Sequence, residues 1–234
     1  MIILGISTSS KFASAAVMKP RLKKDAVVSF CYENGQRTGR SHSEILMELI
    51  DKAISDADVK INELDAVAVD VGPGSFTGLR IGVSCANALA YALDTPVLPV
   101  CSLTAMCLGD DFFISKCVGD DRFEADGDDG VDVIHAALID CRNGNCYAAA
   151  YDGERREVIA PSAAVTKEVL EQLQLPEKMT LFAGDALDDK HKDFYSYPNA
   201  KQVLIAAQRL GIQPVKQAVP MYLRPSQAER MKKD

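Results

Sequence analysis

The 234-residue sequence has no tryptophan and no apolar run near the roughly 20 residues that a membrane-spanning helix needs. Its seven cysteines include no Cys-x-x-Cys pair, which disfavours zinc-ribbon and thioredoxin-like redox sites and favours reduced thiols. Basic residues are the minority, 26 against 33 acidic ones, for a net charge of −7. The chain alone is therefore not expected to bind nucleic acid or an anionic membrane, because phosphate contacts need clustered Lys and Arg.

The amino-terminal residues also lack the basic start of a secretory signal. We therefore expect the protein in the cytoplasm. Hydrophobic residues make up 47% of the chain, enough for a substantial core in one large domain or two small ones.

A central stretch predicts a strand, a glycine-rich turn and a long helix. Val67, Val69 and Val71 carry β-branched side chains that favour a strand. The turn is expected at residues 72–74, Gly-Pro-Gly, because proline removes a backbone donor and glycine permits positive φ. Ser75 or Thr77 can then cap the helix, with backbone N–H groups suited to an anion or to a facing protein loop.

Two predicted helices are candidates for a partner interface. In the central helix small residues recur every fourth position from Gly78 to Ala90, a stripe that lets another helix backbone come close. The helix expected over residues 41–56 has an apolar face wider than one sheet requires, which predicts a second packing partner. The predicted interface residues are His42, Glu44, Ile45, Leu46, Leu49, Gly78, Leu79, Arg80, Gly82, Val83, Ala86 and Ala90.

The order three strands, helix, strand, helix occurs twice along the chain. This repeat predicts two similar α/β halves, residues 1–108 and 133–234, each a mixed sheet with helices packed on it, meeting at a cleft. Residues 109–132 are acidic and poor in apolar anchors, so we expect a mobile insertion. A calcium loop is disfavoured there, because Asp129 stands where the loop needs glycine and His135 where it needs a bidentate acid. The helix-like tail at residues 219–230 is expected to fold back on the first half.

No catalytic set can be assembled from the residues alone. The three histidines, His42, His135 and His191, are far apart in sequence. Asp70 and Asp140 both end predicted strands and could act as acid and base, yet carboxylates at strand ends are common without chemistry. The sequence alone therefore assigns no catalytic residue, because it does not show which side chains lie together in space.

Paired α/β halves that contain hairpins suggest the superfamily of acetate and sugar kinases, Hsp70 and actin. Five strings make the resemblance closer, and in chain order they resemble the TsaB family of bacterial tRNA-modification subunits. They are ILGISTSS at 3–10, RSHSEIL at 40–46, GPGSFTGLRIG at 72–82, LIDCRNGNCYAAAYD at 138–152 and MYLRPSQAER at 221–230.

The resemblance implies two actin/RNase H-like (ASKHA) halves and a non-catalytic scaffold subunit. Such a subunit works with TsaD, which transfers the threonylcarbamoyl group to the adenosine next to the anticodon in tRNAs reading ANN codons, and with the ATPase TsaE. It implies no cofactor of its own and tRNA contact only through the complex. Two points stay open: whether ATP or ADP binds at the junction of the complex, and whether the free subunit forms a homodimer, which an exposed apolar helix pair would favour.

Two departures from enzymes of this superfamily support that expectation. A TsaD-like enzyme has a metal-binding His-x-x-x-His pair where this chain has Ser102 and Met106, which are poor ligands for a divalent ion. Members that bind nucleotide usually have aspartate at the end of the first strand, where this chain has Ser7, so magnesium has no obvious anchor. Most sequences that resemble TsaB have the aspartate too, so Ser7 is also a departure from that family.

Alternatives from other classes remain open. One is a small-molecule kinase or ATPase of the same fold, against which Ser7 counts. Another is a metalloprotease or metal-dependent transferase, against which the missing histidine pair counts. The residues that we retain as candidates for a nucleotide or loop contact are Ser7, Thr8, Ser9, Gly72, Pro73, Gly74, Ser75, Phe76 and Thr77.

Overall fold

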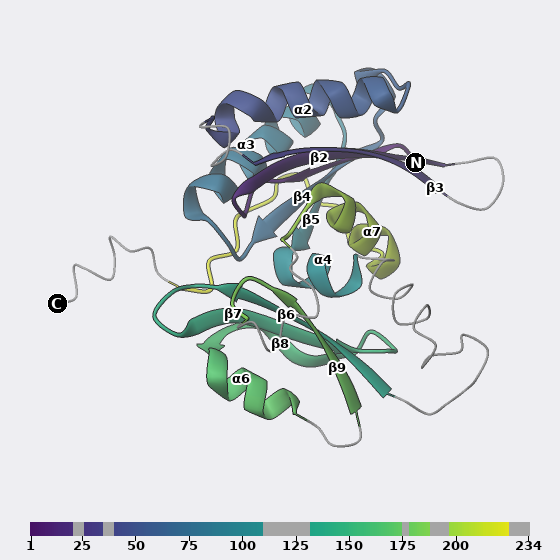
Figure 1. Ribbon diagram of the computed structural model, residues 1–234. Helices are drawn as coiled ribbons and strands as arrows, with labels where there is room; N and C mark the ends of the chain where they lie inside the picture. Colours follow the sequence, from purple (N-terminus) through teal and green to yellow (C-terminus); the bar gives the residue numbers. More distant parts are fainter. Residues whose placement is uncertain (21–25, 35–39, 110–131, 175–177, 188–196, 225–234) are drawn as a thin grey trace.

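The computed structural model describes residues 1–20, 26–34, 40–109, 132–174, 178–187 and 197–224. The acidic insertion predicted at 109–132, apart from its two end residues, lies outside the described residues, as do His191 and the tail beyond Arg224. Two β-sheets form the framework, with two helices between them and further helices on the outer face of each (Figure 1).

The first sheet has the strand order β3-β2-β1-β4-β5. Antiparallel pairing joins β1 (Ile3–Ser7), β2 (Phe12–Pro20) and β3 (Ala26–Asn34), while β4 (Ala66–Gly72) and β5 (Val97–Cys101) run parallel to β1. Every residue of β1 and β4 is buried, as expected for central strands with helices on both faces.

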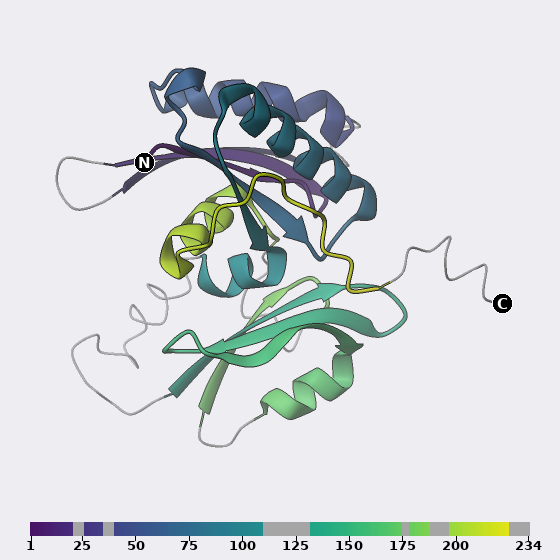
Figure 2. The ribbon, with the colours of Figure 1, turned by 180° about the vertical axis from the view of Figure 1, so that it is seen from behind.

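Helices α2 (His42–Asp56) and α3 (Phe76–Leu93) cover the outer face of this sheet, where they share one apolar cluster with β1, β2 and β4 (Figures 1 and 2). A short 3-10 turn, η1 (Ile61–Glu63), leads from α2 to β4. The side chain of Glu44 accepts from the backbone N–H of Ser41, and Ser75 Oγ accepts from the N–H of Gly78. These caps fix where the two helices begin.

The second sheet has the strand order β8-β7-β6-β9. Strands β6 (Asp132–Asp140), β7 (Asn145–Asp152) and β8 (Glu157–Val165) form an antiparallel meander, and β9 (Lys178–Gly184) lies parallel to β6. Helix α6 (Thr166–Leu173) packs on its outer face through Val169 and Leu173.

Two helices, α4 (Ser102–Leu108) and α7 (Ala200–Leu210), lie between the sheets (Figure 1). Helix α7 packs on the first sheet, where Val203, Leu204 and Ala207 join an apolar cluster with β1, β2, β4 and β5. Helix α4 contributes Leu103, Met106 and Leu108 to a cluster with β6, β7 and β9. Although α7 follows the second sheet in the chain, its apolar face is therefore buried against the first.

The segment after α7, residues 211–224, crosses the molecule as an extended strap (Figure 2). Val215 makes an isolated antiparallel bridge with Val97, and Asn87 on α3 exchanges two hydrogen bonds with the backbone of Ala218. The N–H of Met221 then donates to the carbonyl of Val71 at 2.6 Å. Over residues 219–224 the expectation that the tail folds back on the first half is confirmed, whereas the expectation of helix is wrong there. Residues 225–230 lie outside the described residues.

Candidate functional site

A buried carboxylate lies where strands β1 and β4 end. Asp70 is 1% exposed and accepts four hydrogen bonds. The hydroxyl of Ser7 donates to Oδ2 at 2.8 Å and the N–H of Gly72 to Oδ1 at 3.0 Å, and the hydroxyls of Ser9 and Ser102 donate as well. We call these five residues the Asp70 cluster. It joins β1, the β1–β2 turn, β4 and α4 at one point.

Burial is the largest influence on the Asp70 carboxyl, and it raises the pKa above the ordinary value because the charged form loses its hydration. The hydrogen bonds from Ser102, Ser9, Ser7 and Gly72 act in the opposite direction. Each oxygen of this carboxylate already accepts hydrogen bonds from donors within the chain. The cluster therefore has a structural role: it ties the ends of β1 and β4 to α4.

The second strand-end carboxylate, Asp140, is exposed, and no contact joins it to Asp70. Its Oδ1 accepts from the N–H of Arg142, and its own N–H donates to Asp185 Oδ1, both at 2.8 Å. Burial is the main cause that raises the pKa of Asp185, and the charge of Asp140 adds to it. The structure therefore gives no support to an acid–base pair of Asp70 and Asp140.

The metal site of a TsaD-like enzyme does not fit the residues present. Ser102 and Met106 both lie on α4 and are fully buried. Ser102 donates its hydroxyl to Asp70, and Met106 packs in the apolar cluster below α4. Across the described parts of the chain, no group of three or more His, Cys, Asp or Glu side chains is placed to hold a metal ion.

The first hairpin turn, a candidate for nucleotide contact, is occupied by the chain itself. Thr8 Oγ1 donates to the carbonyl of Gly78 at 2.7 Å, and the N–H of Ser75 donates to the carbonyl of Ser9 at 2.6 Å. Thr8 and Ser9 are buried, at 1% and 4% exposure. A Cβ added at Gly74 would lie 2.5 Å from the carbonyl oxygen of Ser9. The glycine-rich turn thus fits against the hairpin turn backbone to backbone.

The other candidates of this group divide by exposure. Pro73, which follows a cis peptide bond from Gly72, is buried, whereas Ser75, Phe76 and Thr77 are exposed at the first turn of α3. Gly72 has φ of +105°, and a Cβ there would lie 2.9 Å from the carbonyl oxygen of Met221. Only the exposed group can reach another molecule without movement of the turn.

The prediction that the small-residue stripe of α3 faces a partner is wrong. A Cβ added at Gly78 would lie 2.0 Å from the backbone oxygen of Thr8, and one added at Gly82 would lie 2.3 Å from Thr8 Oγ1. Ala86 and Ala90 are buried in the cluster beneath α3. The stripe is small because it packs on the β1–β2 turn and the sheet of its own chain.

Most of the other predicted interface residues are buried for the same reason. Glu44 and Arg80 are exposed, and His42 is half-buried with its Nε2 3.4 Å from the carbonyl oxygen of Lys11. The buried members, which cannot form a surface in this chain, are Ile45, Leu46, Leu49, Gly78, Leu79, Gly82, Val83, Ala86 and Ala90.

A different set of side chains forms the outward face of this helix pair. Met47 is 47% exposed and Tyr91 is 90% exposed. Met47 Sδ lies 3.8 Å from Cys85 Sγ, which places α2 and α3 side by side at this point. We define the outer stripe as Met47, Ile81, Ser84, Cys85, Ala88 and Tyr91. Its spacing on α3, positions 81, 84, 85, 88 and 91, was visible in the sequence, but the stronger glycine–alanine pattern beside it obscured it.

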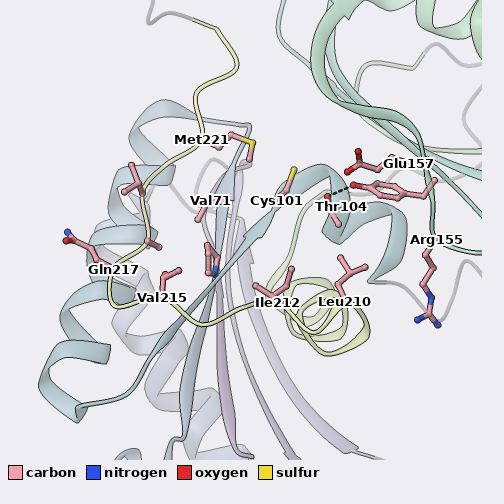
Figure 3. A pocket seen from close by; sticks show the side chains of 14 residues that line it. Val71, Cys101, Thr104, Arg155, Glu157, Leu210, Ile212, Val215, Gln217 and Met221 are labelled. Atoms are coloured by element: carbon pink, nitrogen blue, oxygen red, sulfur yellow. Dashed lines mark hydrogen bonds between the residues drawn. The ribbon is translucent and has the colours of Figure 1, made fainter.

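A cleft of about 620 Å³ opens between the two halves, on the side crossed by the strap (Figure 3). Its walls are largely apolar, from β4, β5, the end of α7 and the strap, with Arg155 and Glu157 on the second half. Thr104 Oγ1 and Tyr151 OH lie 2.8 Å apart in its wall. Burial raises the pKa values of Cys101 and Tyr151, so both groups are protonated at neutral pH and neither is an activated nucleophile.

His135 on β6 is half-buried, and burial together with the nearby Arg209 lowers the pKa of its imidazole.

Among the described residues no helix has both the length and the apolar character required to span a bilayer.

Comparison with protein families gives a match at residues 35–117 to TsaD, the tRNA N6-adenosine threonylcarbamoyltransferase. The chain is 35% identical over 106 residues to the tRNA threonylcarbamoyladenosine biosynthesis protein TsaB of Haemophilus influenzae, covering 45% of this chain and 42% of that protein. It is 28% identical over 187 residues to TsaB of Bacillus subtilis, covering 79% of this chain and 71% of the relative.

A tRNA N6-adenosine threonylcarbamoyltransferase of Staphylococcus aureus is 38% identical over 110 residues, 43% of this chain and 32% of that enzyme. Among solved structures, a Pseudomonas aeruginosa protein described as similar to the peptidase YeaZ has a TM-score of 0.66 at 25% identity, covering 95% of this chain and 99% of that one. YeaZ from the same organism has a TM-score of 0.63 at 24% identity, with the same coverage. These comparisons show that the chain is similar to TsaB proteins and has the two-halved actin/RNase H-like fold of the Pseudomonas aeruginosa structures.

Proposed function

We propose that the chain is a non-catalytic subunit that supports a TsaD-like enzyme in making threonylcarbamoyladenosine in tRNA. The observation that carries the proposal is that the TsaD family match, residues 35–117, spans α2, α3, the aspartate of the Asp70 cluster and α4. The chain thus resembles the transferase over the same elements in which a TsaD-like enzyme has its metal-binding histidines. At those two positions this chain has Ser102 and a buried Met106. A TsaE-like ATPase, with ATP or ADP at the junction, completes the proposed assembly.

The outer stripe is the proposed docking face for the TsaD-like subunit. It lies on α2 and α3, and the exposed side chains of Tyr91 and Met47 give it apolar area that a partner can bury. Since the TsaD family model matches these two helices, the partner has a related helix pair, and two related pairs can pack about a pseudo-twofold axis as in an isologous dimer. By the same symmetry, a second copy of this chain could bind the outer stripe when no TsaD-like subunit is present, and the two partners would then compete for it.

We expect Ala88→Arg to weaken binding to the TsaD-like subunit without changing the fold. Ala88 is exposed on α3, so arginine costs little in the free chain, but a buried unpaired charge at an interface costs on the order of 2–5 kcal/mol, or roughly 30-fold or more in Kd. Isothermal titration would measure the Kd, and thermal melting would report the fold.

Gln172→Arg on α6 is the matched control, an exposed helix position on the other half that receives the same side chain. Its Kd should equal that of the wild type. If the Ala88→Arg variant bound the TsaD-like subunit with the same Kd as the wild type, the outer stripe would not be the docking face. Sedimentation of the free wild-type chain, with and without Ala88→Arg, reports whether a second copy uses the same face.

Reconstitution tests the proposed role itself. The purified chain would be mixed with the TsaD-like and TsaE-like proteins of its organism, ATP, threonylcarbamoyl-adenylate and unmodified tRNA. Modification is expected only when the chain is present together with the TsaD-like protein, and ATP turnover by the chain alone is expected to be absent. ATP hydrolysis or phosphoryl transfer by the isolated chain would instead favour a kinase or ATPase of this fold.

A further inference from the structure

A cluster of arginine and aromatic side chains lies at the first turn of α3, apart from the Asp70 cluster, the outer stripe and the cleft. The rings of Phe76 and Tyr222 are in tilted contact, with centroids 4.9 Å apart and an interplanar angle of 32°. The guanidinium carbon of Arg80 lies 3.9 Å from the centroid of Phe76, and Arg80 Nε donates to the hydroxyl of Tyr222 at 3.3 Å. Phe76 and Tyr222 are 37% and 46% exposed, so ring surface remains open to solvent.

The positive charge continues from this point onto the second half. Arg224 Nη1 donates to the carbonyl of Cys141 at 3.3 Å and lies 3.1 Å from Cys141 Sγ. The next residue, Arg142, is exposed in the β6–β7 turn. We call Phe76, Arg80, Tyr222, Arg224 and Arg142 the arginine–aromatic cluster. The contact of Arg224 with Cys141 joins the strap to the second half, and Figure 2 shows the end of the strap beside the β6–β7 turn.

None of the three arginines has a carboxylate partner within the described part of the chain. The nearest acid that a contact joins to the cluster is Asp140, which accepts from the backbone of Arg142 and not from its guanidinium. Arg80 and Arg224 are held by Tyr222, Phe76 and Cys141, so these contacts position the two guanidinium groups but do not neutralise their charge.

Guanidinium forks match the geometry of phosphate oxygens, and exposed aromatic rings stack on unpaired bases. An acidic protein surface would use the arginines alone, whereas single-stranded RNA uses both kinds of group. We propose that the arginine–aromatic cluster contacts RNA, as an auxiliary surface for a single-stranded loop of the tRNA that the complex modifies. This inference rests on the proposed function for the identity of the RNA.

The test is a fluorescence titration of a labelled tRNA anticodon stem–loop with the chain in complex with its TsaD-like subunit, over a series of salt concentrations. Arg80→Ala combined with Arg224→Ala should raise Kd about tenfold and reduce the slope of log K against log salt by about 1.4, two phosphate contacts at about 0.7 each. Tyr222→Leu should weaken binding severalfold, while Tyr222→Phe, which keeps the ring, should bind as the wild type does.

Lys201→Ala, an exposed lysine on α7, is the control for the loss of one positive charge away from the cluster. The Kd of each variant for the TsaD-like subunit, measured without RNA, separates the two proposals. If no complex forms, the proposed function fails and the same titration is run on the chain alone at low salt. RNA affinity and salt slope unchanged in the double variant would overturn the RNA proposal. Loss of subunit binding with unchanged RNA affinity would overturn it too, as would the absence of measurable RNA binding in both settings.

Discussion

Gly82→Leu is expected to lower the melting temperature of the isolated chain by about 6–12 °C. Even a single methyl group at position 82 would lie 2.3 Å from Thr8 Oγ1, so a leucine has to displace the β1–β2 turn. Overpacking of this kind costs about 3 kcal/mol, and in a chain of this size 1 kcal/mol shifts the melting temperature by about 2–4 °C. Circular dichroism melting measures the shift.

Ala88→Leu is the control for Gly82→Leu, because it places the same side chain at an exposed position of the same helix. Its melting temperature should stay within about 2 °C of the wild type, since exposed helix positions tolerate leucine well. An unchanged melt for Gly82→Leu as well would mean that the stripe lies at the surface and that its burial against Thr8 is wrong.

A rescue experiment identifies Thr8 as the contact. Gly82→Ala meets the Thr8 side chain, whereas Gly78→Ala meets the Thr8 backbone oxygen at 2.0 Å. Thr8→Ala should therefore recover part of the stability lost in Gly82→Ala, although Thr8→Ala alone costs the hydrogen bond to Gly78. The same change should recover nothing for Gly78→Ala. Two double-mutant cycles test this, one for Thr8→Ala with Gly82→Ala and one for Thr8→Ala with Gly78→Ala. A coupling free energy of about zero in both cycles would contradict this arrangement.

Most of the fold could be predicted from the local pattern of the chain. The helix expected over residues 41–56 is observed as α2, His42–Asp56, because the capping residues Ser41 and Glu44 and a wide apolar face are local signals. Strands β1 and β4 were likewise expected, since continuous β-branched and apolar runs of this length favour buried strands.

Helix α4 was not predicted, and its composition explains why. All seven of its residues are buried, so the sequence SLTAMCL has no polar face and no helical period. Its N-cap residue, Cys101, makes no side-chain capping bond. A short helix enclosed by two sheets is defined by tertiary packing, and that information is not present in any window of the sequence.

The candidate site could be predicted in part. The glycine turn, Ser7, Ser102 and Asp70 were each noticed separately, but only the fold shows that the two serines donate to the one aspartate. The direction of the small-residue stripe could not be read from the sequence, because close approach to a partner helix and close approach to the β1–β2 turn require the same glycines. Exposure, as at Tyr91, decides between the two.

The stability of the wild type relative to Asp70→Asn is expected to fall as pH rises from 3.8. Asp70 has its pKa raised in the folded chain by burial, above the ordinary value of 3.8 that applies when the chain is unfolded. Between the two values the folded chain binds a proton that the unfolded chain has released, so its free energy of unfolding decreases with increasing pH. Above the folded pKa this contribution becomes constant.

The asparagine variant cannot ionise, and its amide can still donate to the hydroxyls of Ser7 and Ser9 if these turn to accept. The difference between the two proteins should therefore isolate the titration of Asp70, with a slope of at most about 1.4 kcal/mol per pH unit. Urea unfolding from pH 4 to pH 8 measures it. A difference that stays constant, or that grows in favour of the wild type as pH rises, would mean that the folded chain does not raise this pKa.

Asp70→Ala distinguishes the hydrogen bonds of the cluster from its charge. This variant also lacks an ionisable group, but it leaves Ser7, Ser9 and Ser102 buried without their common acceptor, which should cost about 3 kcal/mol or more at every pH. Asp70→Ala should therefore be the least stable of the three proteins throughout the series. If it matched Asp70→Asn instead, the three serines would have found other partners, and the Asp70 cluster would not be the junction that joins β1, β4 and α4.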